Sequence, residues 1–202
     1  IYKLSDLTKF LSLINTKDII KSKDKIYYNL AMSFDIETSS FYEDKNGVVY
    51  TNDEYRKLKH TVKADKKAIM YIWQFAIEDN VIIGRSWNDF LYFCKKLYDF
   101  LNLKERYIVV YVHNLSYEFQ FICRWFNWVD IFADSERKPL KAMTDTHFIF
   151  KCSYRLSGYS LEVLANNLKS HNIKKMVGDL DYNLIRNSKT PLSDEELKYC
   201  EN

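Results

Sequence analysis

Glycine and proline are scarce in this chain, which has four Gly and two Pro among 202 residues, about 3% against roughly 12% in average usage. The few glycines leave no G-x-G-x-x-G motif and no Gly-rich loop that could cradle a phosphate. A nucleotide-binding fold built on Gly-rich turns is therefore not expected.

Cysteines and histidines are few and scattered. The four Cys form no C-x-x-C pair, and none of the four His lies beside one. The pattern predicts neither a Cys/His zinc site nor a disulfide framework, and it favours a reducing, intracellular setting. The longest apolar runs, such as the one around Ile108–Val112, are about five or six residues long and far too short to span a membrane, and no signal-peptide pattern is present. We expect no membrane association.

Charge is nearly balanced, with 30 Lys+Arg against 27 Asp+Glu and a net charge of +3. Net charge alone therefore does not indicate a nucleic-acid partner, and a basic surface would have to be local. Hydrophobic residues make up 47% of the chain, enough for the core of one domain. The chain begins at Ile1 without Met and stops inside a helical pattern at Asn202, so we interpret it as a piece of a longer protein.

The N-terminal part predicts a short appendage before the main domain. Apolar residues at helical spacing from Leu4 to Ile14 predict an amphipathic helix, and a Lys-rich connector follows up to residue 28. The main domain is expected over 29–202, beginning with a buried strand at Asn29–Ile36. The charged, weakly periodic stretch Ser39–Lys67 is interpreted as an excursion or a long loop on the surface.

The rest of the chain predicts alternating strands and helices. Two strands are expected to meet at a turn at Asp79–Asn80, and the strand at Ile108–Val112 is expected to be central and buried on both faces. The predicted pattern is a mixed α/β sheet with helices on its faces. In chain order the further elements are strands at Ile69–Ile77 and Val81–Trp87, a helix at Trp87–Leu101, a helix through Phe119–Phe126, strands at Val129–Ala133 and His147–Lys151, a helix at Ser160–Leu168, and a last helix with a Ser193–Glu196 capping box.

Two carboxylates end the first predicted strand. Asp35 and Glu37 alternate with apolar residues, so they point to one face of the strand about 7 Å apart. Neighbouring carboxylates repel each other unless a cation neutralises them, and Mg²⁺ or Mn²⁺ suits oxygen ligands. The alternative is a solvated strand end that carries two ordinary surface acids.

A second polar segment, His113-Asn114-Leu115-Ser116-Tyr117-Glu118, follows the predicted central strand. Ligands bind at this end of the strands in open α/β sheets. Asn114 offers an amide and Tyr117 an aromatic face, which suit a single-stranded nucleic acid. The alternative is an ordinary helix start, with Asn114 as the cap and Glu118 favourable for the helix dipole.

Tyr199 lies on the last predicted helix, where the position four residues later would share its face but falls one beyond Asn202. Alone, Tyr199 could equally be a buried core residue or a functional one. Together, however, the three segments resemble the exonuclease motifs of family B DNA polymerases, most closely the protein-primed phage branch. Asp35-x-Glu37-Thr38 resembles the first motif, His113-Asn114-Leu115-x-Tyr117-Glu118 the second, and Tyr199 with its spacers the start of Tyr-x-x-x-Asp.

The chain departs from this family pattern in three places. The acid of the second motif is usually Asp and is Glu118 here, and the closing Asp of the third motif is not in the chain. The segment 178–182, Gly-Asp-Leu-Asp-Tyr, also resembles one of the protein-primed group. The Lys that usually precedes it is replaced by Val177, with Lys174 and Lys175 slightly upstream.

The resemblance implies a ribonuclease H-like fold of the DEDD-type 3′→5′ exonucleases and a two-metal hydrolysis of DNA. It implies that Asp35, Glu37 and Glu118 bind two Mg²⁺ or Mn²⁺ ions and that Tyr199 contacts the attacking water. The residues expected to hold single-stranded DNA at its 3′ end are Thr38, Asn114, Tyr117, Ser153 and Tyr154.

The family also implies a setting. This would be the proofreading domain of a monomeric DNA-directed DNA polymerase, with the polymerase domain after residue 202. Its partners would be primer-template DNA and a terminal protein primer, and its location the cytoplasm of a phage-infected bacterium. Two alternatives stay open, namely a free-standing exonuclease of the same fold and a non-catalytic domain that binds single-stranded nucleic acid.

Overall fold

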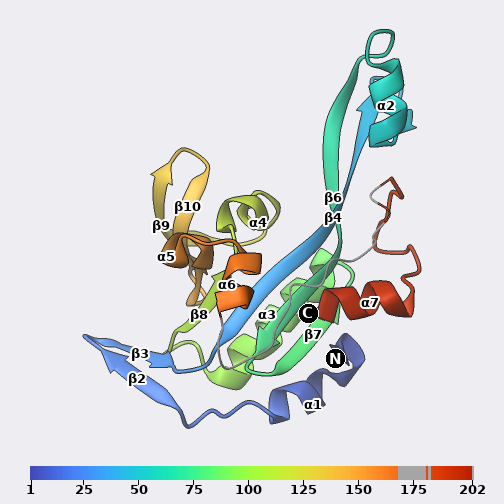
Figure 1. The fold of residues 1–202 in the computed structure, drawn as a ribbon. Coiled ribbons are helices and arrows are strands. Elements are labelled where there is room, and N and C mark those ends of the chain that lie inside the picture. Colours follow the sequence, from blue (N-terminus) through green and yellow to red (C-terminus); the bar gives the residue numbers. More distant parts are fainter. Residues whose placement is uncertain (168–180, 182, 202) are drawn as a thin grey trace.

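A computed structural model describes residues 1–167, 181 and 183–201. In this part of the chain, nine strands form one mixed sheet in the order β1-β7-β6-β4-β8-β11-β10-β9, and β5 pairs with β4 (Figure 1). The strands of this sheet are β1 Tyr2–Lys3, β4 Met32–Asp44, β5 Val49–Tyr50, β6 Ala64–Ile77, β7 Asn80–Gly84, β8 Ile108–Val112, β9 Trp128–Ser135, β10 Lys138–Thr144 and β11 Phe148–Cys152.

A separate hairpin and a set of helices complete the described fold. The elements are hairpin strands β2 Ile19–Ser22 and β3 Lys25–Tyr28, the 3₁₀ turn η1 Leu4–Asp6, and helices α1 Leu7–Ser12, α2 Asn52–Leu58, α3 Trp87–Leu101, α4 Leu115–Ile122, α5 Ser153–Ser157, α6 Leu161–Asn167 and α7 Asp194–Glu201. The predicted mixed α/β sheet with flanking helices is confirmed.

The main hydrophobic core lies on one face of the sheet. Alternation along β4 buries Phe34 and Ile36 there, and α1, α3 and α4 pack over this face. Phe90 of α3 stacks on Phe34 at a centroid distance of 4.7 Å. The helix predicted at Trp87–Leu101 is confirmed with the same bounds, because its apolar residues recur at helical spacing and Ser86 caps its first turn.

The opposite face is covered only in part among the described residues. Over β6 and β7, α7 packs through Leu197 and Tyr199 on a smaller cluster that contains Ile72. Over β8 the face is open, since Tyr111 is 39% exposed. The prediction that Ile108–Val112 is buried on both faces is therefore wrong. Its β-branched residues reflect strand propensity, and only alternate positions reach the core.

The stretch Ser39–Lys67 forms an excursion, as one of the two alternatives predicted, but it is regular and is not a loop. β4 and β6 stay paired from Thr38↔Met70 out to Asp44↔Ala64 and form an arm, with β5 and α2 at its tip (Figure 1). The Thr51–Glu54 capping box starts α2, and Tyr42 stacks on Tyr55 at 3.8 Å. Charged side chains mark this segment as exposed, but cross-strand hydrogen bonds still make it regular.

The Lys-rich connector is likewise regular, because β2 and β3 pair in register from Ile19↔Tyr28 to Ser22↔Lys25. The strand predicted at Asn29–Ile36 begins at Met32, within β4. The predicted turn at Asp79–Asn80 lies one residue earlier, because Ile77 pairs with Asn80 and Glu78 takes the left-handed backbone.

Five strands were missed in the predicted order, namely β1, β2, β3, β5 and β10. β10 lies between the two strands predicted at 129–133 and 147–151, and the sequence hides it because Pro139 is rare within strands. Its register with β9 shifts at Pro139. The helix predicted at Ser160–Leu168 is described as α6 up to Asn167, and the Ser193–Glu196 capping box is present at the start of α7. The helix predicted through Phe119–Phe126 lies earlier, at Leu115–Ile122, so its predicted bounds are wrong. Of the 178–182 segment only Asp181 is described, and Lys174, Lys175, Val177 and Asn202 lie outside the described residues.

Candidate active site

Asp35 and Glu37 stand together on the face of β4 opposite the main core. Their neighbours Phe34 and Ile36 are buried in the core, so the pleat turns both carboxylates to the other side. Next to Glu37, the register with β6 shifts, which leaves Tyr71 as an extra residue between the partners of Glu37 and Thr38. Such bulges twist a strand pair locally and re-aim its side chains.

Glu118 reaches these carboxylates from α4. It shares the buried face of α4 with Leu115 and Ile122, and it is only 4% exposed. Its Oε2 atom has no hydrogen-bond partner among the described residues. Asn114 takes the left-handed backbone at the start of α4, which Asn tolerates, but its side chain makes no capping hydrogen bond. Asn114 is thus the N-cap residue of α4, as the alternative interpretation had it, but it does not cap the helix with its side chain.

The three carboxyl groups act on one another electrostatically. Burial, followed by the charge of Asp35, raises the pKa of Glu118 to about 8, and the same two causes raise the pKa of Glu37 to about 7. Loss of solvation also raises the pKa of Asp35, although hydrogen bonds from the Ile36 amide and from the Glu118 carboxyl oppose this rise. Asp35 remains solvent-accessible, so the cluster is reachable from outside.

The charge of this cluster favours binding of a cation, because a positive ion would neutralise the repulsion between the desolvated carboxylates. Carboxylate oxygens are also suitable ligands for hard divalent metals. Among the described side chains, however, no group of three or more His, Cys, Asp and Glu is placed to hold a metal ion. The three carboxylates thus have the right chemistry for a divalent ion without the arrangement of a complete site, and the carboxyl groups of Asp35 and Glu118 interact with each other.

Thr38 and Tyr117 meet beside the carboxylates. The Thr38 hydroxyl and the Tyr117 hydroxyl share a hydrogen bond that joins β4 to α4. Tyr117 is 39% exposed, and its ring packs against Phe121 at a centroid distance of 5.3 Å. An exposed aromatic ring held in place by its neighbours is available for stacking.

Ser153 and Tyr154 lie at the same end of the sheet. Both begin α5, directly after β11, and His113 at the end of β8 contacts both of them. The His113 ring nitrogen Nδ1 is 3.2 Å from the Ser153 hydroxyl, and its ring meets that of Tyr154 edge-on at 5.6 Å. His113 thus joins the second sequence motif to these two residues.

Tyr199 lies on the same sheet face as the carboxylates. It is half-buried on α7 and packs against the small cluster that contains Tyr71 and Ile72. Ile72 is the cross-strand partner of Glu37, so its side chain and the Glu37 carboxylate emerge side by side. The helix that carries the third motif is thereby brought next to the strand that carries the first.

Three residues that the sequence analysis missed organise this site. Gln74 is the cross-strand partner of Asp35, is 8% exposed, and has an Oε1 atom without a partner among the described residues. It is the one polar residue in the predicted strand Ile69–Ile77, and this signal could have marked it. Arg186 and Arg85 hold the segment that leads into α7, and their isolated positions in the sequence gave no such signal.

Arg186 ties α7 to β4. Its guanidinium donates to Glu196 of α7 at 2.7 and 2.6 Å, and its backbone amide donates to the Ser39 hydroxyl at 2.9 Å. Arg85 donates to the carbonyl of Tyr71 at the bulge and to the carbonyl of Thr190. These contacts fix α7, and with it Tyr199, over the strands beside the carboxylates.

Comparisons with protein-family models, with curated proteins and with solved structures found no match for this chain. Among the described residues no helix is both long enough and apolar enough to cross a membrane.

Proposed function

We propose that this chain is the 3′→5′ exonuclease domain of a protein-primed family B DNA polymerase, with a ribonuclease H-like fold, and that it removes nucleotides from unpaired primer ends. One observation carries the proposal. Glu118, from a motif more than 80 residues after Asp35, is buried with an unpartnered oxygen and contacts Asp35. A purely structural core would leave this position apolar, because an unsatisfied buried carboxyl group is costly.

The chemistry assigned to each residue follows from its place. Mg²⁺ or Mn²⁺ held by Asp35, Glu37 and Glu118 would supply an activated water and relieve charge on the leaving oxygen. Tyr199 orients the attacking water by a hydrogen bond. Thr38 and Asn114 hold the last nucleotide, and Tyr117 stacks on a base, an interaction that is worth roughly 1–3 kcal/mol.

Ser153 and Tyr154 extend this grip to the neighbouring nucleotide, because His113 holds both beside the second motif. The expected partners are single-stranded DNA and a frayed primer-template end. A terminal protein and a polymerase domain following residue 202 belong to the same proposal, as does its place in DNA replication in a phage-infected bacterial cell.

A non-catalytic domain that binds single-stranded nucleic acid is the second candidate. It is favoured by the absence, among the described side chains, of a group of three or more placed to hold a metal ion. A free-standing exonuclease would have the same site and differ only in its context.

The test follows a 5′-labelled single strand with Mg²⁺ or Mn²⁺, using the 202-residue chain and the same chain with one Asp added after Asn202. A ladder that shortens from the 3′ end supports the exonuclease. Asp35→Ala and Glu118→Gln are expected to lower the rate at least about 100-fold. Glu136→Gln, an exposed acid in the β9–β10 turn, is the matched control and should leave the rate unchanged.

Intact DNA in every one of these reactions, together with measurable binding of the strand, would support the non-catalytic candidate instead. Adding Glu118→Asp to the extended chain then separates the two possibilities further. Recovered cleavage would identify the longer side chain at this position as the defect, and continued inactivity would overturn the exonuclease assignment.

A further inference from the structure

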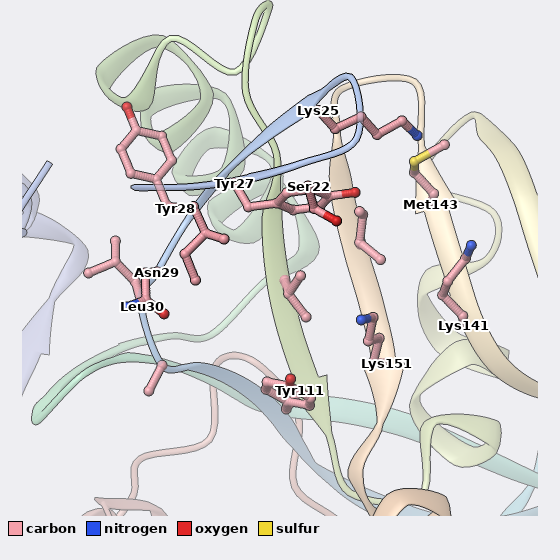
Figure 2. A pocket seen from close by; sticks show the side chains of 14 residues that line it. Ser22, Lys25, Tyr27, Tyr28, Asn29, Leu30, Tyr111, Lys141, Met143 and Lys151 are labelled. Atoms are coloured by element: carbon pink, nitrogen blue, oxygen red, sulfur yellow. The ribbon is translucent and has the colours of Figure 1, made fainter. Parts of the chain in front are cut away.

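A second site lies on the same face of the sheet, in a groove that none of the motifs includes. The β2–β3 hairpin forms one wall, and the open face of β8, β11 and β10 forms the other (Figure 2). The groove has a volume of about 570 Å³. Its lining residues include Lys25, Tyr27, Asn29, Tyr111, Lys141 and Lys151.

The groove is positively charged. Figure 2 shows Lys25 on the hairpin wall, with Lys141 and Lys151 on the sheet wall. Lys141 and Lys151 are direct cross-strand partners, and like charges in such positions destabilise a sheet. Lys141 pairs with Asp130 at 2.6 Å. In the described part of the chain, no acidic residue lines the groove and Lys151 has no ion-pair partner. The ammonium group of Lys151 is therefore available to bind an anion from outside the protein.

Aromatic rings lie between these lysines. Tyr111 is 39% exposed on the open face and is the strand neighbour of Lys151. Tyr27 lines the groove from the hairpin, and its ring lies 5.4 Å from that of Tyr107. Lysines for phosphates together with rings for bases form the combination that binds single-stranded nucleic acid without sequence preference.

Strand register connects the groove to the carboxylates. Ser33 of β4 pairs with Tyr111 of β8, and Tyr111 pairs with Lys151 of β11, so these three side chains share one face. Asp35 is two residues beyond Ser33 on that same face. Strand spacing and rise place the Cα atoms of Asp35 and Lys151 roughly 12 Å apart, a few nucleotides along a strand.

We propose that this groove binds the phosphates and bases of the DNA strand a few nucleotides upstream of the 3′ end held at the carboxylates. The inference rests on the proposed function for the direction of the strand. The groove sets the minimum length of strand that binds well, because a short oligonucleotide ends before it reaches Lys151 and Lys25.

The test measures binding by fluorescence anisotropy in a buffer without divalent metal, so that it does not depend on hydrolysis. The probes are labelled dT12 and dT3, and the protein is the 202-residue chain. The Lys25→Gln/Lys151→Gln double variant is expected to bind dT12 at least about 10-fold more weakly and dT3 less than 2-fold more weakly. The dependence of log K on log salt should fall by roughly 0.7 for each phosphate contact that is lost.

Lys95→Gln is the matched control. Lys95 is exposed on α3, which packs against the other face of the sheet, and its loss should change neither affinity. Lys151→Arg should keep dT12 binding. Lys151→Gln removes the repulsion between Lys141 and Lys151, so the variant without DNA should melt at the same temperature as the unmodified chain or higher. This measurement distinguishes a loss of DNA contacts from a loss of folding.

Equal loss of dT12 and dT3 binding in the double variant would overturn the proposal, as would unchanged binding of both. Competition by inorganic phosphate or by mononucleotides as strong as that by dT12 would also overturn it, since the groove would then be a small-anion site. The exonuclease proposal can fail independently of this one. In that case the DNA would stay intact in the cleavage assay, while dT12 binding would still depend on the groove lysines.

Discussion

Glu118 has an environment unlike that of a solvated acid. It is 4% exposed, has an unpartnered oxygen, and lies against Asp35. In the folded protein its protonated form is favoured, whereas in the unfolded chain it ionises near its ordinary pKa of 4.5. The folded state therefore loses stability when Glu118 must ionise, unless a cation compensates.

The sign of the resulting pH dependence follows directly. The pKa of Glu118 is raised from 4.5 to about 8, so its contribution to stability is fully present below pH 4.5 and is lost as pH rises towards 8. In EDTA, the melting temperature of the unmodified chain is expected to fall between pH 5 and pH 8 by several degrees more than that of Glu118→Gln.

Calorimetry or circular dichroism across pH 5–9 checks this, with Glu136→Gln as a surface control that should follow the unmodified chain. Adding Mg²⁺ at pH 8 should restore part of the loss in the unmodified chain but not in Glu118→Gln, because ligand binding to the folded state stabilises it. Parallel curves for the unmodified chain and Glu118→Gln would contradict the assigned environment.

At the scale of elements, a partly buried ion pair helps to hold α7 in position. Arg186 is 6% exposed in its side chain and Glu196 is 19% exposed, and the pair joins the preceding segment to α7. The capping box of Ser193 and Glu196 starts the helix at the same point. Glu196 therefore takes part in both the start of the helix and its attachment.

Arg186→Met is expected to destabilise the attachment of α7 by about 3 kcal/mol, because Glu196 loses its partner and the carbonyls of Asp181 and Leu184 lose a donor. Hydrogen exchange of the amides in 193–201 measures this, and their protection should fall before that of α3. Arg56→Ala, which removes an exposed pair with Asp53, is the control and should cost less than about 1 kcal/mol. Equal effects from the two variants would contradict the structural role of the pair.

At the scale of the whole molecule, the β4–β6 arm is separate from the core. Neither hydrophobic cluster contains a residue between Phe41 and Met70. The arm is held by strand pairing, by the α2 capping box and by the Tyr42–Tyr55 stack (Figure 1). The tip of the arm therefore adds no side chain to the two core clusters.

Replacing residues 45–63 by an Asn-Gly turn is expected to lower the melting temperature by less than about 5 °C, since the replaced tip adds no side chain to either core cluster. Thermal unfolding followed by circular dichroism checks this. Phe34→Ala, which empties a fully buried position under α3, should cost about 3–5 kcal/mol in the same assay. A comparable loss from both changes would show that the arm supports the core.

Local patterns in the sequence were enough for much of the site. The two-residue period of a strand places Asp35 and Glu37 on one face, and the helical period places Glu118 with Leu115 and Ile122. Each of these placements depends only on residues a few positions apart in the sequence. Helical periodicity and the capping box likewise predicted α3 and the start of α7, because these signals are also local.

The sequence by itself determined α3, the capped start of α7, and the placement of two carboxylates on one strand face, because side-chain periodicity and capping are local properties of the chain. Only the tertiary structure decided that Gln74 lies beside Asp35, that Arg186 anchors α7, and that Lys141 and Lys151 face one groove. These contacts depend on strand register and on packing between distant segments. Register is selected by the burial of a whole face at once, and no single stretch of sequence contains that information.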